Sequence, residues 1–145
     1  MRVEDSEAIA HLASQLGYPS SPDEVADRVG RLVAVPEREA LLAAVAADDV
    51  PVGWAHVEIR DTLVAPRQAQ LMGLVVGNGE RGQGIGRQLL LAAEAWAASR
   101  GCEVLIVATR VTRGDAHRFY RREGYALNKT SHLFNKALAR SDPGA

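Results

Sequence analysis

The spacing of apolar residues in the first third of the chain predicts two short helices. Residues 7–16 place an apolar side chain every three or four positions, between Ser6 as a candidate N-cap and Gly17 as a stop signal. A second helix is expected to begin after Ser21, because Ser21 and Glu24 have the spacing of a capping box. Each helix therefore has one apolar stripe to bury.

Farther along, the alternation of apolar and polar positions predicts a β-hairpin over residues 38–60. Its second half alternates small or apolar residues with Trp54, His56 and Glu58, as expected of a strand with one buried face. Its first half is rich in Ala and Leu, which by propensity alone favours a helix. The aspartates before Pro51 are typical of a turn, so we interpret the two halves as paired strands.

The remaining chain predicts a buried strand, a long helix, a second buried strand, a short helix and a closing strand. The two buried strands must run parallel, because the connection between them crosses over through a helix. Gly73, inside the first of these strands, predicts a β-bulge or a close approach of backbone. The expected elements are residues 70–76, 85–100, 102–109, 115–123 and 130–138, and the whole describes a mixed α/β fold.

Composition and charge narrow the class of protein. The 145 residues suit one domain, expected over residues 1–138, with a flexible tail at 139–145. A net charge of -1 gives no basic field for nucleic acid, and no apolar run is long enough to span a membrane, so neither partner is expected. Cys102 is the single cysteine, which fits a cytoplasmic location. No two histidines have metal-ligand spacing, and no metal is expected.

The candidate chemistry lies in the stretch GERGQGIGRQLL, between the first buried strand and the long helix. Glycines and the charges of Arg81 and Arg87 at a helix N-terminus predict a bound phosphate or pyrophosphate. A Walker loop is excluded, because the stretch lacks Gly-Lys-Ser/Thr. Gly77, Gly79 and Gly82 do spell the dinucleotide fingerprint of NADPH-binding proteins, but that loop usually follows the first strand of a domain.

Two motifs resemble the GNAT superfamily of N-acetyltransferases. Residues 81–86 read RGQGIG and are similar to its acetyl-CoA signature R-x-x-G-x-G. Residues 116–125 are similar to its segment A-x-x-F-Y-x-x-x-G-[FY]. The two motifs follow one another in the expected order, and the resemblance covers about residues 70–138. It implies a central mixed sheet of about six strands with a splayed parallel pair, flanked by about four helices.

The same resemblance implies the direct transfer of an acetyl group from acetyl-CoA to a primary amine. The acceptor is expected to be a small molecule or a peptide or protein amine. Tyr120 holds the superfamily position of the general acid that protonates the CoA thiolate. The apolar last strand offers an edge for a possible homodimer. The residues expected to bind acetyl-CoA are Leu74, Val75, Val76, Arg81, Gly82, Gln83, Gly84, Ile85, Gly86, Arg87, Thr109 and Tyr120.

The chain also departs from the superfamily pattern. The strand before the loop lacks the usual glutamate, which leaves Glu58 and His56 as tentative bases. Thr109 stands near the place of the usual asparagine, and Arg110 and Arg113 have no assigned role. The first strand is expected to be shortened or missing, since only residues 1–5 precede the first helix. The missing glutamate leaves one alternative function, a non-catalytic CoA-binding sensor or partner module.

Overall fold

The computed structural model describes residues 1–140. The chain divides into two compact units, of which the first spans Met1–Ala108 and the second begins at Thr109. Residues 141–145, which belong to the tail expected at 139–145, lie outside the described part of the chain.

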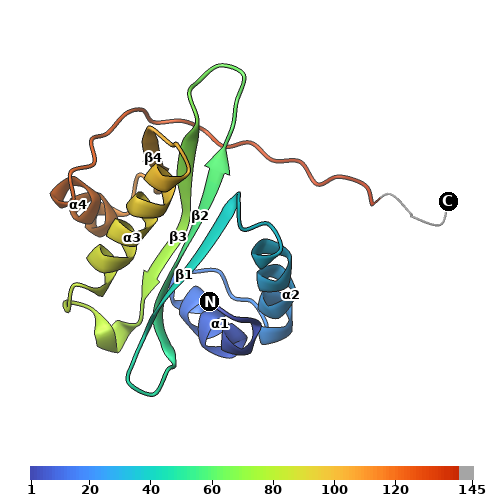
Figure 1. Cartoon of the computed structure of the whole chain (residues 1–145). Coiled ribbons are helices and arrows are strands. Elements are labelled where there is room, and N and C mark those ends of the chain that lie inside the picture. Colours follow the sequence, from blue (N-terminus) through green and yellow to red (C-terminus); the bar gives the residue numbers. More distant parts are fainter. Residues whose placement is uncertain (141–145) are drawn as a thin grey trace. The chain divides into compact units, whose positions relative to one another are not determined.

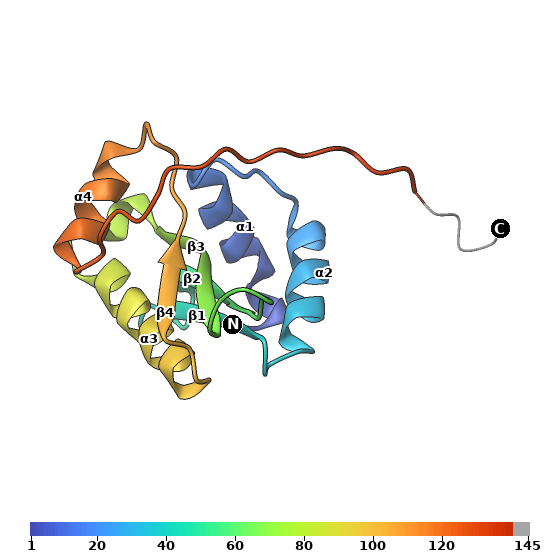
Figure 2. The same cartoon turned by 90° about the horizontal axis from the view of Figure 1, so that it is seen from above.

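The first unit is a four-stranded sheet with helices on both faces. The sheet has the order β1-β2-β3-β4, in which β1, β2 and β3 are antiparallel neighbours and β4 runs parallel to β3. Helices α1 and α2 cover one face and α3 covers the other (Figures 1 and 2). The elements are η1 (Val3–Asp5), α1 (Ser6–Gln15), α2 (Pro22–Val33), β1 (Glu39–Val45), β2 (Pro51–Arg60), β3 (Gln68–Val76), η2 (Asn78–Glu80), α3 (Ile85–Ser99) and β4 (Val104–Val107).

The two N-terminal helices form where the sequence predicts them, with one change at a cap. The hydroxyl of Ser21 accepts a hydrogen bond from the backbone N–H of Glu24 at 3.1 Å, as its position before α2 predicts. Ser6, in contrast, is the first residue of α1 and not its N-cap. The 3-10 turn η1 precedes it and moves the N-cap to Asp5, so the expectation for Ser6 is wrong.

The two faces of β2 explain where the core lies. Ala55, Val57 and Ile59 are almost completely buried on the face toward α3. Trp54, on the opposite face, packs against a cluster formed by α1 and α2. Burying a side chain of the size of Val57 or Ile59 stabilises the fold by about 1.5–3 kcal/mol. The predicted alternation of β2 is therefore confirmed, and its polar partners face the α1–α2 side.

The β-bulge predicted at Gly73 is present in β3. Gly73 pairs with His56 and Leu71 pairs with Val57, which leaves Met72 as the extra residue. Gly73 also has a packing role, because a Cβ atom there would lie 2.7 Å from the indole ring of Trp54. The bulge thus coincides with a close approach between two neighbouring strands.

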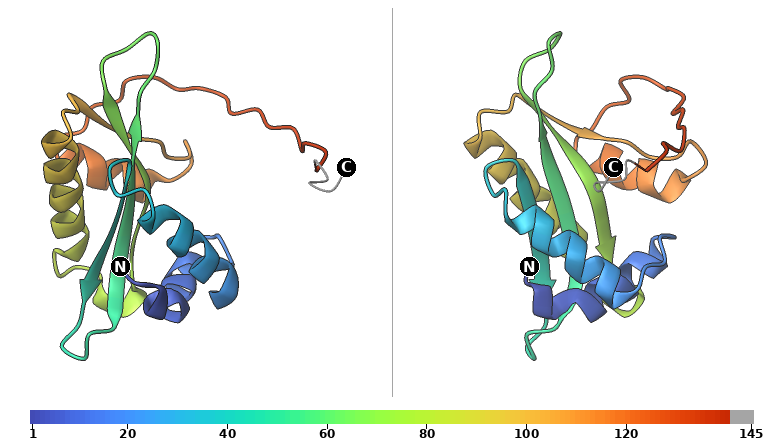
Figure 3. Two further views of the ribbon diagram at one scale, coloured as in Figure 1. Left: turned by 45° about the vertical axis from the view of Figure 1, so that its right-hand side comes forward. Right: turned by 90° about the vertical axis from the view of Figure 1, so that its right-hand side faces the viewer.

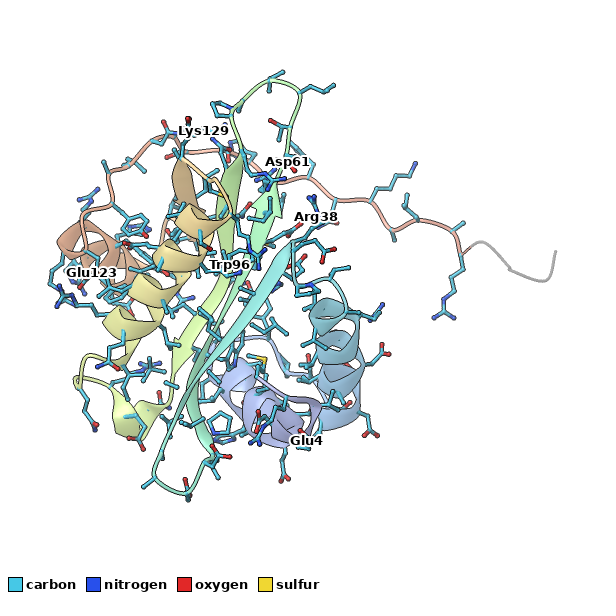
Figure 4. All side chains as sticks on the ribbon, viewed as in Figure 1. Glu4, Arg38, Asp61, Trp96, Glu123 and Lys129 are labelled. Carbon is cyan, nitrogen blue, oxygen red and sulfur yellow. The ribbon has the colours of Figure 1, made fainter. Side chains whose placement is uncertain are left out.

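The ends of β1, β2 and β3 are tied together by ion pairs. Asp61, just after β2, lies 3.5 Å from Arg38 and 2.8 Å from Arg67, measured between side-chain nitrogen and oxygen atoms. Figure 4 shows Arg38 and Asp61 at this end of the sheet, and Figure 3 shows the loop of residues 61–67 protruding beyond the helices. The hydrogen bond from Arg67 lowers the pKa of Asp61. All three side chains are solvent-exposed, so salt screens these contacts.

The sheet differs from the expected six strands. Within residues 1–140 it has four strands, and the chain before α1 forms a 3-10 turn in place of a strand. The strand expected at 130–138 is also absent there, and Leu133 and Phe134 are 94% and 90% exposed. An isolated strand cannot satisfy its own backbone N–H and C=O groups, and this segment pairs with no described strand. β4 is shorter than the expected 102–109 and only half-buried.

The second unit contains one helix, α4 (Gly114–Arg122), within its described residues. The helix stops as predicted before Gly124, whose φ of +93° is a conformation that favours glycine. The backbone N–H of Tyr125 then donates to the carbonyl of Tyr120 at 2.9 Å. This return of the chain packs the ring of Tyr125 against that of Tyr120, with the ring centroids 5.7 Å apart.

Candidate functional site

The glycine-rich loop joins the end of β3 to the N-terminus of α3. Gly82 and Gly84 have φ angles of +82° and +79°. An L-residue with a side chain pays roughly 1–2 kcal/mol for this left-handed conformation, which explains the glycines at both positions. Gly84 is the N-cap of α3, and its carbonyl accepts the N–H of Gln88 at 3.0 Å. The loop is therefore shaped by backbone conformation, with Gly84 at its turn into the helix.

This loop has the electrostatics of an anion site. The first N–H groups of α3 have no partner in their own helix, and a helix N-terminus has about half a positive charge. The first turn of α3 contains no acidic residue. Arg81, Gln83 and Arg87 are exposed around it, and the Nε of Arg81 donates to the carbonyl of Val76 at 3.4 Å. The predicted phosphate-binding residues thus share one short loop.

The strand leading to this loop has an edge without a β4 partner. β4 pairs only with Gln68–Leu71, so the parallel pair ends at Leu71. Beyond the bulge, Leu74, Val75 and Val76 keep their pairing with β2 on the other side. β4 itself ends at Val107, so the splayed parallel pair that the resemblance implies stays a prediction. The edge without a β4 partner leaves extended backbone beside the start of the glycine loop.

The tentative bases lie on the α1–α2 face of β2, and a residue of β1 joins them. The Nε2 atom of His56 is 2.8 Å from the Oε2 atom of Glu39. Glu58 is the direct cross-strand partner of Glu39. The side chains of His56 and Glu39 are only 20% and 13% exposed, so this pair is partly shielded from water. On β3, Gln70 accepts a hydrogen bond from Arg60 at 2.6 Å, and no acidic side chain is present.

The remaining candidates belong to the second unit. Tyr120 packs edge-on against Phe119, with ring centroids 5.1 Å apart. Burial raises the pKa of Tyr120 to about 12, which the nearby Arg113 partly opposes. Its hydroxyl therefore stays protonated at neutral pH, as a proton donor must. Thr109 is exposed, and the carbonyl of Arg110 lies 2.9 Å from the Nε2 of His117.

The sheet topology decides between the two readings of the glycine pattern. A dinucleotide-binding domain needs a mostly parallel sheet with helices between successive strands. Here β1, β2 and β3 are antiparallel neighbours, and within residues 1–140 the one parallel pair is β3–β4. The match to the acetyltransferase (GNAT) family model extends over residues 7–125. The chain belongs to this family. It is therefore an acetyl-CoA-dependent acyltransferase, as the two motifs predict.

Curated relatives of this GNAT protein are N-acetyltransferases. An aminoglycoside N(6')-acetyltransferase type 1 of Stenotrophomonas maltophilia is 31% identical over 137 residues, which cover 92% of this chain and 89% of that protein. An aminoalkylphosphonate N-acetyltransferase of Salmonella typhimurium is 50% identical over 70 residues, which cover 48% of this chain and 44% of that protein. This second similarity thus spans less than half of either protein.

Solved structures share the GNAT fold. The aminoglycoside N-acetyltransferase AAC(6')-Iy in complex with CoA has a TM-score of 0.82 and 21% identity, and covers 95% of this chain and 92% of its own. Glucosamine-6-phosphate N-acetyltransferase from Arabidopsis thaliana has a TM-score of 0.79 and 16% identity, with 94% of each chain covered. At these identities the likeness establishes the fold.

Two residues of the GNAT site region were missed by sequence reasoning. Gln15, at the end of α1, accepts a hydrogen bond from the backbone N–H of Asn78 at 3.1 Å and so ties α1 to the start of the glycine loop. Glu39 contacts His56 across the hairpin. Neither position belongs to a motif. The contact of Gln15 depends on where α1 ends, and the contact of Glu39 depends on the register of β1 against β2. Of these two features, the strand register is the one that a sequence pattern could have indicated.

Metal-ligand side chains do not gather in the described part of the chain. Residues 1–140 contain no group of three or more His, Cys, Asp or Glu side chains arranged to hold a metal ion. Burial raises the pKa of the Cys102 thiol, which keeps it in its less reactive protonated form. No helix in that part of the chain has the length and apolar character needed to cross a membrane.

Proposed function

We propose that this protein transfers the acetyl group of acetyl-CoA directly to the primary amine of a small molecule. The observation that carries the proposal is the free edge of β3 at Leu74–Val76, which leads into the glycine loop at the N-terminus of α3. One continuous stretch of backbone thus offers hydrogen bonds to an extended chain and N–H groups to phosphate at its end.

Acetyl-CoA would be held along that stretch. Its pantetheine arm would pair with the backbone of Leu74, Val75 and Val76, as an added strand does at a sheet edge. The N–H groups of residues 82–87 and the guanidinium of Arg81 would hold its pyrophosphate. Thr109, with an exposed hydroxyl, is proposed as a further hydrogen-bond donor to the arm.

The chemistry requires two proton transfers. The amine must lose a proton before its lone pair can attack the thioester carbonyl, and His56 and Glu58 are the proposed acceptors of that proton. The C–S bond then breaks, and the sulfur takes a proton. Tyr120 is proposed to donate it, because its hydroxyl is protonated at neutral pH and holds the superfamily position of the acid. The family match crosses both units, which supports one acetyltransferase domain over residues 1–138.

The acceptor we favour is the 6'-amine of an aminoglycoside. The relative named for that amine matches over 92% of this chain, whereas the aminoalkylphosphonate relative matches over 48%. The acidic side chains of Glu39 and Glu58 on the α1–α2 face suit a cationic acceptor better than an anionic phosphonate. An aminoalkylphosphonate is the second acceptor to test.

The test is a thiol-release assay with acetyl-CoA and matched panels of both acceptor classes. We expect release of free CoA that depends on acceptor, together with a product heavier by one acetyl group in mass spectrometry. Acceptors with the 6'-amine replaced by a hydroxyl are the control, and they should give no product. Thermal stabilisation by acetyl-CoA without turnover of any amine in the panel would contradict the proposal and leave a CoA-binding module.

A further inference from the structure

We propose that His56 is the catalytic base of this reaction and that Glu39 is its positioning residue. The inference rests on the proposed function and deepens it by choosing between the tentative bases and adding a residue from β1. The starting observation is the contact of 2.8 Å between His56 Nε2 and Glu39 Oε2, between two side chains that are mostly shielded from solvent.

The contact fixes which nitrogen of His56 can accept a proton. A carboxylate accepts hydrogen bonds only, so the Nε2 of His56 must be the nitrogen that has the hydrogen. In a neutral imidazole the other nitrogen, Nδ1, then has a free lone pair. Nδ1 makes no hydrogen bond to any protein atom in the described part of the chain. Glu39 therefore orients the ring and presents Nδ1 as the basic atom.

His56 lies level with the point where β3 loses its β4 partner, which is where we propose that the acetyl group of the bound acetyl-CoA lies. His56 pairs with Gly73, two residues beyond the last pair that joins β3 to β4, Leu71 with Val107. Neighbouring strands lie about 4.8 Å apart, and one strand, β3, separates the backbone of His56 from the edge without a β4 partner. We propose that water relays the proton from the amine across the remaining distance.

Trp54 shares this face of β2 with His56, two positions along the strand. Its indole covers Gly73, with ring atoms 2.7 Å from where a Cβ would be. Its Nε1 is the one buried side-chain nitrogen or oxygen without a hydrogen-bond partner in the described residues. Since this nitrogen is shielded from solvent, it is closed to the acceptor, and the indole contributes to this face through its packing over Gly73.

Glu58 is a weaker candidate for the base. It lies two residue pairs farther from Gly73 than His56 does, since Gly73 pairs with His56 whereas Glu58 pairs with Gln70. Glu58 also stands directly opposite Glu39, and two facing carboxylates repel each other. His56 lies between the unpaired edge of β3 and the two carboxylates, so it can take the proton from the amine side. The carboxylate of Glu58 would need a longer chain of water molecules to reach the same amine.

The proton balance of the step is complete with these groups. The acceptor ammonium gives one proton, through water, to Nδ1 of His56, and the imidazolium is stabilised by the Glu39 carboxylate. The amine lone pair forms the C–N bond with the thioester carbonyl carbon, and the C–S electron pair leaves with the sulfur. The sulfur takes the proposed Tyr120 proton, and the second amine proton restores Tyr120. His56 then releases its proton to solvent, so one proton is produced per acetyl group transferred.

The first experiment compares steady-state rates with acetyl-CoA and the acceptor found for the wild type. The His56→Gln variant should lose about a hundredfold or more in kcat, the usual effect of removing a general base. Glu39→Ala should lose roughly tenfold, and Glu39→Gln less, because its amide oxygen still accepts the Nε2 hydrogen. KM for acetyl-CoA should not change in any of them. Glu37→Gln, an exposed carboxylate two residues away, is the matched control and should keep full activity.

The second experiment reads the ring directly, without turnover. In ¹⁵N-histidine-labelled wild-type protein at about pH 8, we expect the His56 signals of an Nε2–H tautomer. Glu39→Gln should keep this tautomer and Glu39→Ala should lose it, while Glu37→Gln should leave it unchanged. A purely packing role for Glu39 predicts no such split between Gln and Ala. This measurement also holds if a His56 variant fails to fold, because it uses the native histidine.

The outcomes separate the two proposals. If wild-type protein acetylates no amine, the proposed function fails, whatever the ring signals are. If wild-type protein is active but folded His56→Gln retains its kcat, or if Glu58→Gln alone abolishes turnover, then His56 is not the base. An Nδ1–H tautomer in the wild type would equally overturn the proposal, because Nδ1 would then have no lone pair to accept a proton.

Discussion

The substitution Gly84→Ala tests whether backbone conformation shapes the glycine loop. Gly84 is the N-cap of α3 and has a φ of +79°, a conformation that residues with a side chain rarely adopt. A Cβ atom at this position would meet no other atom within 4 Å. Any loss of stability in Gly84→Ala therefore reports the cost of the backbone angle, with no contribution from a steric clash.

The size of the loss follows from the angle alone. The left-handed conformation costs an L-residue roughly 1–2 kcal/mol, which lowers the melting temperature by about 3–8 °C for a chain of this length. Gly79 offers a matched control in the same loop, because a Cβ there also meets nothing within 4 Å and its φ is not in the left-handed region. Gly79→Ala should be neutral or gain about 0.4–1 kcal/mol by restricting the unfolded chain.

The assay is thermal unfolding of the three proteins, with and without acetyl-CoA. Without ligand, Gly84→Ala should melt below wild type and Gly79→Ala at or above it. With acetyl-CoA, Gly84→Ala should gain less stability than wild type, because its Cβ lies where the pyrophosphate is expected to approach the backbone. The reasoning is refuted if Gly84→Ala melts with wild type, or if Gly79→Ala loses as much as Gly84→Ala does.

Three further predictions concern the packing of Trp54 and the role and burial of Tyr120. Gly73→Ala should cost about 1–3 kcal/mol in chemical unfolding, because its Cβ would lie 2.7 Å from the Trp54 ring, and the double variant with Trp54→Leu should recover most of it. Tyr120→Phe should lower kcat about a hundredfold, with Tyr125→Phe as the control. Burial raises the pKa of Tyr120 to about 12 in the folded state from the usual 10 of a free tyrosine, so Tyr120 loses its proton first in the unfolded chain. Stability should therefore fall between pH 10 and 12, and Tyr120→Phe should flatten that fall. A fall of equal steepness in both proteins would contradict the burial of the hydroxyl.

The predictions that held depend on local rules. The cap at Ser21, the alternation of β2 and the stop at Gly124 are properties of a few adjacent residues, and each is present in the structure. The glycine loop was predictable for the same reason, since Gly82 and Gly84 specify a backbone conformation by themselves. The glycine pattern alone predicts a bound phosphate, and the resemblance to the GNAT motif identifies the ligand as acetyl-CoA.

The predictions that failed depend on partners far away in sequence. A strand at 130–138 requires a neighbouring strand to bond with, and neither β-propensity nor apolar content can supply one. The contact of Glu39 with His56 likewise required the register of β1 against β2, which the ambiguous Ala- and Leu-rich half of the hairpin did not reveal. The same holds for Gln15, whose partner Asn78 is 63 positions away.

The bulge at Met72 connects the sequence pattern of β3 to the architecture of the site. In a regular strand Leu71 and Leu74, an odd number of positions apart, would point to opposite faces. The extra residue restores the phase, because Leu71 then pairs with Val57 and Leu74 with Ala55, both on the face toward α3. The apolar run therefore indicates a register shift as well as burial. The pairing of β3 with β4 ends at Leu71, immediately before the bulge. The bulge that places Leu71 and Leu74 on the same face therefore also marks the start of the edge on which we propose that acetyl-CoA lies.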